Sequence, residues 1–154
     1  GVWHRWAAGC PAQGAAVINS RSLGDLDRDT AQKAVAFRDA CDAEGIDIIF
    51  TSTYRDDESQ NALYAQGRTA PGKVVTKVRG GDSYHNWRCA FDFVPIVNGK
   101  AVWDDEHLWE RCGAIGEECG LEWGGDWPRF PDKPHMQNTR GRSTAEFKKL
   151  GCFA

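Results

Sequence analysis

The chain has 154 residues, of which 41% are hydrophobic and 27% are charged. This length and composition are ordinary for one globular domain. The formal net charge of −3 argues against a general nucleic-acid-binding protein, because such proteins are usually strongly basic. No apolar stretch approaches the roughly 18 residues that a membrane-spanning helix requires, so we expect no stable membrane association.

The first residues carry neither the basic start nor the apolar stretch of a signal peptide. We therefore expect that the protein is not exported by that route, or that the chain begins after processing. Residues 1–24 mix glycine, proline, serine and asparagine with scattered apolar positions. This mixture predicts an extended segment that packs on a single domain formed by residues 1–154.

A first helix is predicted after this segment. Asp27 or Asp29 is placed to cap it, it runs to about Ala43, and Gly45 follows where helices commonly end. Helical spacing places a set of apolar residues near one face, which we expect to be buried: Ala31, Ala34, Val35, Phe37 and Cys41.

The next segment predicts a strand, a short helix and a loop. Residues 46–53 are rich in β-branched side chains, which favour a strand. Asp56 is placed to cap a helix over residues 57–66. Residues 67–82 contain four glycines and a proline, which indicates a long loop, and loops of that length are often functional.

A β-hairpin is predicted around Asn98-Gly99, the strongest short signal for a tight turn between strands. Residues 90–97 form its first strand and residues 100–103 pair back on it. Pro95 lacks a backbone N–H, which favours an edge position or a bulge for the first strand.

A further helix begins at Asp104 or Asp105 and is closed by Gly120. Its apolar positions repeat at helical spacing: Leu108, Cys112, Ile115 and Cys119.

Two short strands, residues 121–127 and 135–137, are predicted next, joined by a loop that contains proline. Ser143 and the glutamate three residues later form a capping-box pattern that opens a last helix. The order of these elements predicts an α+β fold with a small, mainly antiparallel sheet flanked by helices.

The chain has six cysteines and no C-x-x-C pair, which argues against a zinc-finger type of site. Cys112 and Cys119 are too far apart along one helix to bridge each other. We expect reduced, partly buried thiols, and long-range disulfides remain the alternative. The cysteines are Cys10, Cys41, Cys89, Cys112, Cys119 and Cys152.

Two of the four histidines, His85 and His135, each stand near a carboxylate in a loop or strand setting. His85 lies at the exit of the glycine-rich loop, and Asp92 lies within the strand that follows. Because side chains alternate along a strand, Phe91 and Phe93 face the core while Asp92 and Ala90 take the other face. A loop histidine can reach Asp92 there. A carboxylate hydrogen-bonded to a structural histidine would give the same pattern.

A second cluster is Asp132-Lys133-Pro134-His135, which Pro134 keeps from being helical. One ligand from this segment would complete a set of two imidazoles and one carboxylate. That donor set suits Zn²⁺ and leaves one position for water. Zinc lowers the pKa of such a water to about 7, and a free carboxylate nearby would carry its proton to a leaving amine.

Taken together, these segments resemble the zinc peptidase family that includes VanY-like D-alanyl-D-alanine carboxypeptidases and phage L-alanyl-D-glutamate endopeptidases. The resemblance covers roughly residues 20–140 and is specific because the pieces occur in the family's order. These pieces are Thr53-Tyr54-Arg55, Gln60 with Leu63, Ser83-x-His85, Asp92, Trp123-Gly124-Gly125-Asp126-Trp127 and Asp132-x-x-His135.

The resemblance implies that His85, Asp92 and His135 are the zinc ligands and that Asp132 is the general base. It also implies that Arg55 binds a substrate carboxylate or stabilises the developing oxyanion, an aid often worth several kcal/mol of barrier.

The resemblance also makes Ser83 and Gln60 substrate-binding residues, with Ser83 beside the bound peptide. The alternative for Arg55 is a surface ion pair with one of the two aspartates that follow it. Asp126 is the runner-up base, although a turn-capping role suits it better.

One departure from the family concerns the third residue after the first ligand histidine. The family usually has glycine there, and this chain has Arg88. Glycine permits a backbone shape that arginine resists. We expect Arg88 to alter the loop or to line the cleft with charge.

The resulting hypothesis is a zinc peptidase of the Hedgehog/D-Ala-D-Ala peptidase-like fold that cleaves peptidoglycan stem peptides as a monomer. The compact single domain resembles phage endolysins, which implies cleavage between L-alanine and D-glutamate by a protein made in the bacterial cytoplasm and acting on the cell wall. The alternatives are a D-alanyl-D-alanine carboxypeptidase, a non-catalytic zinc-containing binding domain as in Hedgehog proteins, and a metal-free wall-binding domain. Asp132 favours an enzyme, because a docking site needs no free base.

Overall fold

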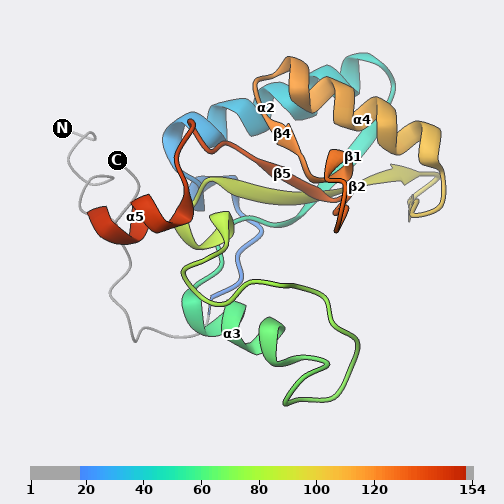
Figure 1. The fold of residues 1–154 in the computed structure, drawn as a ribbon. Helices are drawn as coiled ribbons and strands as arrows, with labels where there is room; N and C mark the ends of the chain where they lie inside the picture. The colour runs from blue at the N-terminus through green and yellow to red at the C-terminus, as the bar shows by residue number, and fades with distance from the viewer. Residues whose placement is uncertain (1–17, 152–154) are drawn as a thin grey trace.

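The computed structural model describes residues 18–151, which form a five-stranded antiparallel sheet flanked by helices (Figure 1). The strands are β1 (Asp47–Ser52), β2 (Ala90–Val97), β3 (Lys100–Ala101), β4 (Glu122–Trp123) and β5 (His135–Gln137). The helices are α2 (Arg28–Ala43), α3 (Asp57–Ala65), α4 (Glu106–Glu118) and α5 (Thr144–Leu150). The strand order is β1-β2-β5-β4, and β3 pairs with β2. The predicted α+β class is confirmed.

The first described residues run alongside the segment that follows β1. The amide of Ser20 donates to the carbonyl of Tyr54 at 2.7 Å, and an isolated bridge joins Asn19 to Arg55. Leu23–Asp25 then form a short 3-10 helix, η1. The extended segment predicted to reach residue 24 therefore ends at residue 22, and its first 17 residues lie outside the described range.

Helix α2 begins and ends as predicted. The side chain of Asp27 accepts from the amide of Thr30, and Gly45 adopts a positive φ of 75° just beyond the last turn. The prediction that Val35 is buried is wrong, since its side chain is 36% exposed. It lies about 100° around the helix from its buried neighbour Ala34, which turns it toward solvent.

Strand β1 and helix α3 confirm the predicted strand and helix to within one residue at each end. The carboxylate of Asp56 caps α3 by accepting from the amide of Ser59 at 2.8 Å. Residues 67–82 form the predicted loop, which contains no helix or strand. Figure 1 shows α3 and this loop set apart from α2 and α4.

Strand β2 spans the predicted residues but is central, so the prediction of an edge strand from Pro95 is wrong. The amide of Phe93 donates toward the β5 side, to the carbonyl of Pro134. Because backbone groups alternate along a strand, the nitrogen of Pro95 faces the same side, beyond His135, the first residue of β5. Its missing N–H therefore breaks no strand pairing. The hairpin forms, with β3 shorter than predicted and Val102 donating to the carbonyl of Pro95.

Helix α4 begins after Asp105, whose side chain accepts from the amide of Leu108, and Gly120 follows it with a φ of 85°. The strand predicted over residues 121–127 ends at Trp123, because Gly124–Asp126 turn into a 3-10 helix, η3. In this turn the carbonyl of Gly124 accepts the amide of Asp132 at 2.9 Å, which a straight strand would not permit.

The core lies between the sheet and the helices α2 and α4. Ring centroids of Phe37 and Phe93 are 4.9 Å apart, and those of Phe93 and Trp109 are 5.3 Å apart. Strand β5 has the predicted bounds, and Ser143 caps α5 as predicted. Within residues 18–151, no helix has the length and apolar character needed to cross a membrane.

The four described cysteines are free, as expected from the sequence: Cys41, Cys89, Cys112 and Cys119. Cys10 and Cys152 lie outside the described residues.

Two glycines of α4 lie against side chains from the sheet, which yields a stability prediction. A Cβ on Gly113 would overlap the ring of Trp123, whereas one on Gly116 would meet the flexible end of Met136. The Trp123 ring is held because its Nε1–H donates to the carbonyl of Lys133 at 2.7 Å. We expect Gly113→Ala to be less stable than the matched Gly116→Ala by about 1–3 kcal/mol in urea unfolding. Equal stabilities would show that the Trp123 ring can move aside.

Candidate metal centre

Asp92 and His135 are brought together by strand pairing. They are directly opposite each other in the antiparallel register of β2 and β5, so their side chains share one face of the sheet. The neighbouring pair, Phe91 and Met136, points into the core on the other face, where both side chains are fully buried. The predicted polar face for Asp92 is thereby confirmed.

His85 reaches the same place from a 3-10 helix, η2 (Tyr84–Trp87). The hydroxyl of Ser83 caps this helix by accepting from the amide of His85 at 3.2 Å. The side-chain oxygen of Asn86 accepts from the amides of Gly81 and Ser83, which fixes the exit of the glycine-rich loop. The short helix therefore holds His85 over the start of β2.

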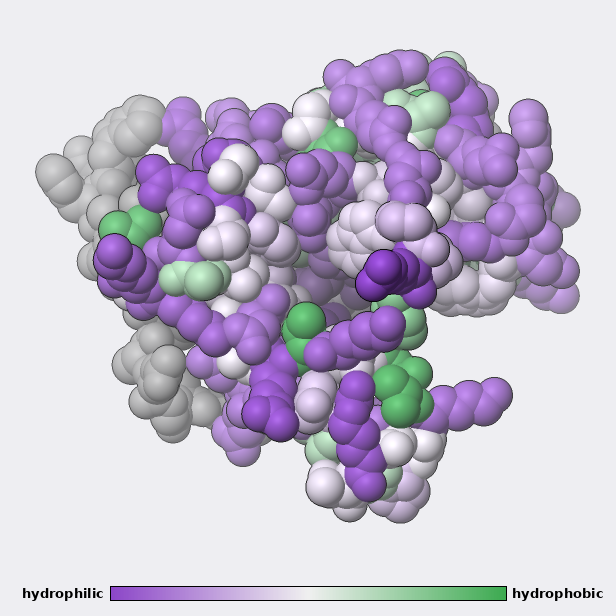
Figure 2. Space-filling model, in the orientation of Figure 1, coloured by the Kyte–Doolittle hydropathy of each residue, from purple (hydrophilic) through white to green (hydrophobic). Residues whose placement is uncertain are grey.

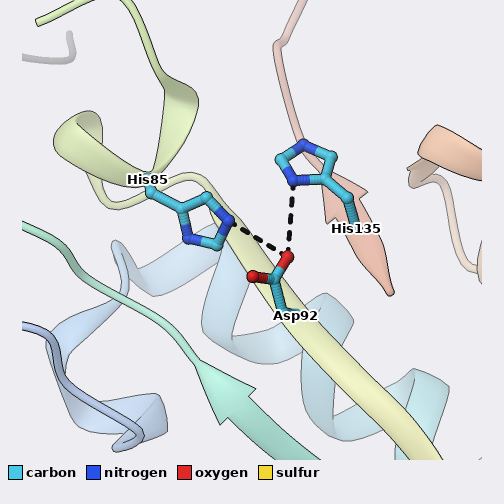
Figure 3. A group of neighbouring side chains, drawn as sticks. All are labelled: His85, Asp92 and His135. Carbon is cyan, nitrogen blue, oxygen red and sulfur yellow. Dashed lines mark hydrogen bonds and ion pairs between the residues drawn. The ribbon is translucent and has the colours of Figure 1, made fainter. Parts of the chain in front are cut away.

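We call His85, Asp92 and His135 the His-Asp-His cluster (Figure 3). Nε2 of His85 lies 3.2 Å from Oδ1 of Asp92, and Nδ1 of His135 lies 3.5 Å from the same oxygen. One ligand atom from each residue lies within 4.8 Å of the others. Among the described residues this group has the geometry of a metal site, and both histidines are buried.

The hydrogen bonds of the two rings fit a metal ion. Nδ1 of His85 lies 2.8 Å from the carbonyl oxygen of Thr53, and Nε2 of His135 lies 2.8 Å from Oε1 of Gln137. Since both partners accept, these nitrogens carry the protons, and each ring turns its other nitrogen toward Asp92. Two nitrogen lone pairs and a carboxylate that converge on one point favour a cation between them. Histidines that bind a metal usually donate their other ring N–H to an acceptor, as both rings do here.

The charges in the cluster are strongly coupled. Burial raises the pKa of Asp92, but the two imidazoles outweigh this effect and hold that pKa far below its usual value. Burial lowers the pKa of His135, but the neighbouring carboxylate of Asp92 raises it above the usual value overall. The site thus favours a carboxylate facing positive charge.

Asp132 lies beside the cluster. Burial raises the pKa of its carboxyl group above the usual value and Asp92 adds to the rise, whereas the two histidines and Arg55 oppose it. The backbone there is fixed because the carbonyl of Asp132 accepts the amide of His135 at 3.1 Å. A half-buried carboxyl group of this kind, which is not itself part of the cluster, is suited to accept and return a proton.

Arg55 faces the cluster and is only 8% exposed. Its Nη2 lies 3.6 Å from Oδ2 of Asp92 and donates to the hydroxyl of Ser52 at 3.0 Å. The alternative of a surface ion pair with the following aspartates therefore does not describe this side chain. Burial lowers the pKa of Arg55, and Asp92 opposes that effect.

Gln60 lies behind Arg55 rather than on an open surface. Its Oε1 accepts from Nη1 of Arg55 at 2.9 Å, and its Nε2 donates to the carbonyl of Val78 and to the hydroxyl of Thr76. The side chain is buried. Gln60 therefore links Arg55 to the loop, and its contact with a substrate stays a prediction.

The loop of residues 67–82 contacts the segment that leads to Asp132. Nζ of Lys77 lies 4.9 Å above the ring of Phe130, which precedes Asp132 by two residues. Figure 2 shows a hollow on this face with hydrophobic side chains beside it. Val74, Val75, Val78 and Phe130 are among the exposed large hydrophobic residues.

Asp126, the runner-up base, is directed elsewhere. Its exposed carboxyl group lies near Glu117 of α4 and raises the pKa of that residue. No side-chain cap is formed at η3, so the turn-capping role is not seen either.

Arg88 adopts the left-handed backbone that a glycine would favour, with φ 62° and ψ 23°. Its guanidinium carbon stacks 3.9 Å from the centre of the Tyr54 ring, and Nη1 donates to the carbonyl of Asp25 at 2.8 Å. The guanidinium group is therefore held against η1 and Tyr54. The expected effect of Arg88 on the loop and on the cleft stays a prediction.

Comparison with known proteins agrees with this geometry. A profile of the D-alanyl-D-alanine carboxypeptidase family matches residues 76–138, which include the cluster. Peptidoglycan L-alanyl-D-glutamate endopeptidase CwlK of Bacillus subtilis is 40% identical over 122 residues, covering 73% of this chain and 73% of that protein. The chain belongs to this family of peptidases. L-alanyl-D-glutamate peptidase of Listeria phage A118 is 32% identical over 137 residues, covering 84% of this chain and 45% of the phage protein.

Solved structures of similar fold extend the comparison. The Serratia marcescens L-Ala D-Glu endopeptidase ChiX has a TM-score of 0.59 at 20% identity, covering 88% of the peptidase chain and 93% of ChiX. The D,D-pentapeptidase VanY, solved as a mutant in complex with Zn(II), has a TM-score of 0.57 at 15% identity, covering 92% and 89% of the two chains. The fold of the peptidase is therefore that of these enzymes.

Sequence reasoning did not single out the partners that orient the two histidines. Thr53 acts through its backbone carbonyl, which leaves no signal in the sequence. Gln137 lies two residues after His135, and this i, i+2 spacing on a strand is a signal that places both on one face.

The backbone of Arg88 yields a matched prediction. Arg88→Ala keeps the left-handed strain and loses the contacts with Tyr54 and Asp25, whereas Arg88→Gly loses the same contacts but removes the strain. We expect the glycine variant to exceed the alanine variant in free energy of unfolding by about 1 kcal/mol, measured in urea. An alanine variant as stable as the glycine variant would contradict this account.

Proposed function

We propose that the protein is a zinc-dependent L-alanyl-D-glutamate endopeptidase that cleaves peptidoglycan stem peptides. The observation that carries the proposal is the His-Asp-His cluster, in which two buried histidines each direct one ring nitrogen at Asp92, with the carboxyl group of Asp132 beside it. The names of the Bacillus and Listeria phage relatives support this choice of substrate.

In this proposal Nε2 of His85, a carboxylate oxygen of Asp92 and Nδ1 of His135 hold the zinc ion. When bound, zinc supplies Lewis acidity that polarises the scissile carbonyl and acidifies a water. Three protein ligands are typical of catalytic zinc sites, which keep one position open. The fixed rings need little reorganisation to bind the ion.

Asp132 is the general base. Its carboxylate removes a proton from the attacking water and then, as the acid, gives that proton to the amine that leaves. Burial raises its pKa, so it holds the transferred proton more readily than an exposed aspartate would. The hydrogen bond from its amide to Gly124 keeps the carboxyl group in place during both transfers.

Arg55 supplies a fixed positive charge at the edge of the cluster. Its guanidinium is held by Ser52 and Gln60 and leaves Nε without a partner. We propose that it stabilises the oxyanion formed from the scissile carbonyl or binds a carboxylate of the substrate. Ser83, which caps the His85 helix, lies next to the bound peptide in this proposal.

The D-alanyl-D-alanine carboxypeptidase activity remains the second candidate, because the profile of that family matches residues 76–138. A non-catalytic docking site has less support, because it would not require Asp132 beside the cluster. The proposed protein is a monomer that is made in the bacterial cytoplasm and acts on the wall.

Variants of the cluster and of the base separate metal binding from catalysis. We expect His135→Ala to lose zinc, measured by metal analysis of the purified protein, because one of three protein ligands is gone. Asp132→Asn should retain zinc and lower kcat by about 10²–10⁴-fold, the usual contribution of general acid–base catalysis. Zinc retained in the histidine variant would contradict the ligand assignment, and full wall lysis by Asp132→Asn would contradict the assignment of the base.

The scissile bond is tested on purified sacculi. We expect digestion to expose new L-alanine C-termini and D-glutamate N-termini, identified by mass spectrometry of the released fragments. Asp132→Asn is the matched control, since it should bind the same wall without cutting it. Release of free D-alanine alone would move the assignment to the carboxypeptidase.

A further inference from the structure

A row of polar side chains crosses one face of the sheet beyond the His-Asp-His cluster. Asp92 of β2 is directly opposite His135 of β5, and Gln137 follows His135 by two residues on the same face. Glu122 of β4 is directly opposite Gln137. Strand pairing alone therefore lines up Asp92, His135, Gln137 and Glu122.

Two hydrogen bonds of 2.8 Å connect the outer part of this row. Nε2 of Gln137 donates to Oε2 of Glu122, and Oε1 of Gln137 lies against Nε2 of His135. An ionised carboxylate can only accept, so Glu122 requires the NH₂ end of the Gln137 amide to face it. The amide oxygen must then face His135, and Nε2 of that ring must carry the proton.

The orientation of one amide thus decides which nitrogen of His135 is free. With the proton on Nε2, the lone pair is on Nδ1, which points at the cluster 3.5 Å from Oδ1 of Asp92. His85 obtains the same result from the carbonyl of Thr53, a backbone group that can only accept. The tautomer of His135, by contrast, depends on the side chains of Gln137 and Glu122, which can be changed by substitution.

We propose that Glu122 and Gln137 are positioning residues that set the tautomer of His135 for metal binding. The inference deepens the proposed function, on which it rests, because it concerns the same metal site. Glu122 is exposed and has no contact with the cluster itself, so it acts through Gln137.

Replacing the acceptor at position 122 by a donor should reverse the orientation of the Gln137 amide and, with it, the tautomer of His135. In Glu122→Lys the ammonium group donates, so it attracts Oε1 of Gln137 and turns the NH₂ end toward His135. Nε2 of His135 then accepts, and its proton moves to Nδ1, where it opposes a metal ion. Glu122→Gln keeps an oxygen that can accept from Gln137, so it preserves the orientation of the Gln137 amide.

The test is a titration of the metal-free protein with Zn²⁺ against a competing chelator. We expect Glu122→Lys to lower zinc affinity by about 10–100-fold, the usual range for partners that orient a ligand histidine. Glu122→Gln should recover most of this loss. Glu110→Lys is the matched control, because it reverses an exposed glutamate on α4, and it should keep the affinity of the unchanged protein.

Nitrogen-15 NMR of the histidine rings gives a readout independent of affinity. At alkaline pH, where the imidazoles are neutral, His135 of the metal-free protein should be protonated at Nε2, and in Glu122→Lys at Nδ1. Gln137→Met, which keeps the side-chain length and removes the acceptor, provides a second variant in case Glu122→Lys does not fold. It should also lose about 10–100-fold in zinc affinity.

Three results would contradict the proposal that Glu122 and Gln137 set the tautomer of His135. The first is unchanged zinc affinity in both Glu122→Lys and Gln137→Met, and the second is a loss of zinc affinity in Glu110→Lys as large as that in Glu122→Lys. The third is a proton on Nε2 of His135 in Glu122→Lys. A failure of the proposed function looks different, since the unchanged protein would then bind no zinc. In that case both the metal site and its tautomer control would be wrong.

Discussion

The convergence of two buried imidazoles on the carboxylate of Asp92 is the constraint on which the rest of the site depends. Asp92 and His135 are fixed by the register of β2 and β5, and His85 is carried to them by a capped 3-10 helix. A one-residue slip of this register would turn Asp92 into the core and bring Phe91 or Phe93 to the site. The aromatic packing against α2 and α4 therefore stabilises the register and, with it, the metal geometry.

A second layer of contacts orients the groups around the cluster. Thr53 and Gln137 each hold one histidine, while Gln60 and Ser52 hold Arg55. Turn η3 and the ring of Trp123 fix the loop that carries the proposed base. Because these partners are mostly buried, the groups that face the substrate are held before it arrives, which lowers the reorganisation required for catalysis.

The departure at Arg88 illustrates how a family position can change without changing the site. The residue keeps the left-handed backbone and compensates with a stacked ring and a hydrogen bond on the side away from the cluster. A cost of about 1 kcal/mol in backbone strain is within the range that two such contacts can offset. The turn of this chain thus requires a left-handed backbone at position 88, which glycine would adopt at lower cost.

The sequence by itself determined most local structure, because caps such as Asp27 and Asp56 and the alternation around Asp92 act over a few residues. The order of the motifs was also enough to indicate the family and its ligand candidates. Only the tertiary structure decided that Gln60 is buried behind Arg55 and that Pro95 lies in a central strand. It also decided that β4 supplies Glu122 as the hydrogen-bond partner of Gln137. These facts depend on which distant segments pair and at what register, and local propensity carries no information about that choice.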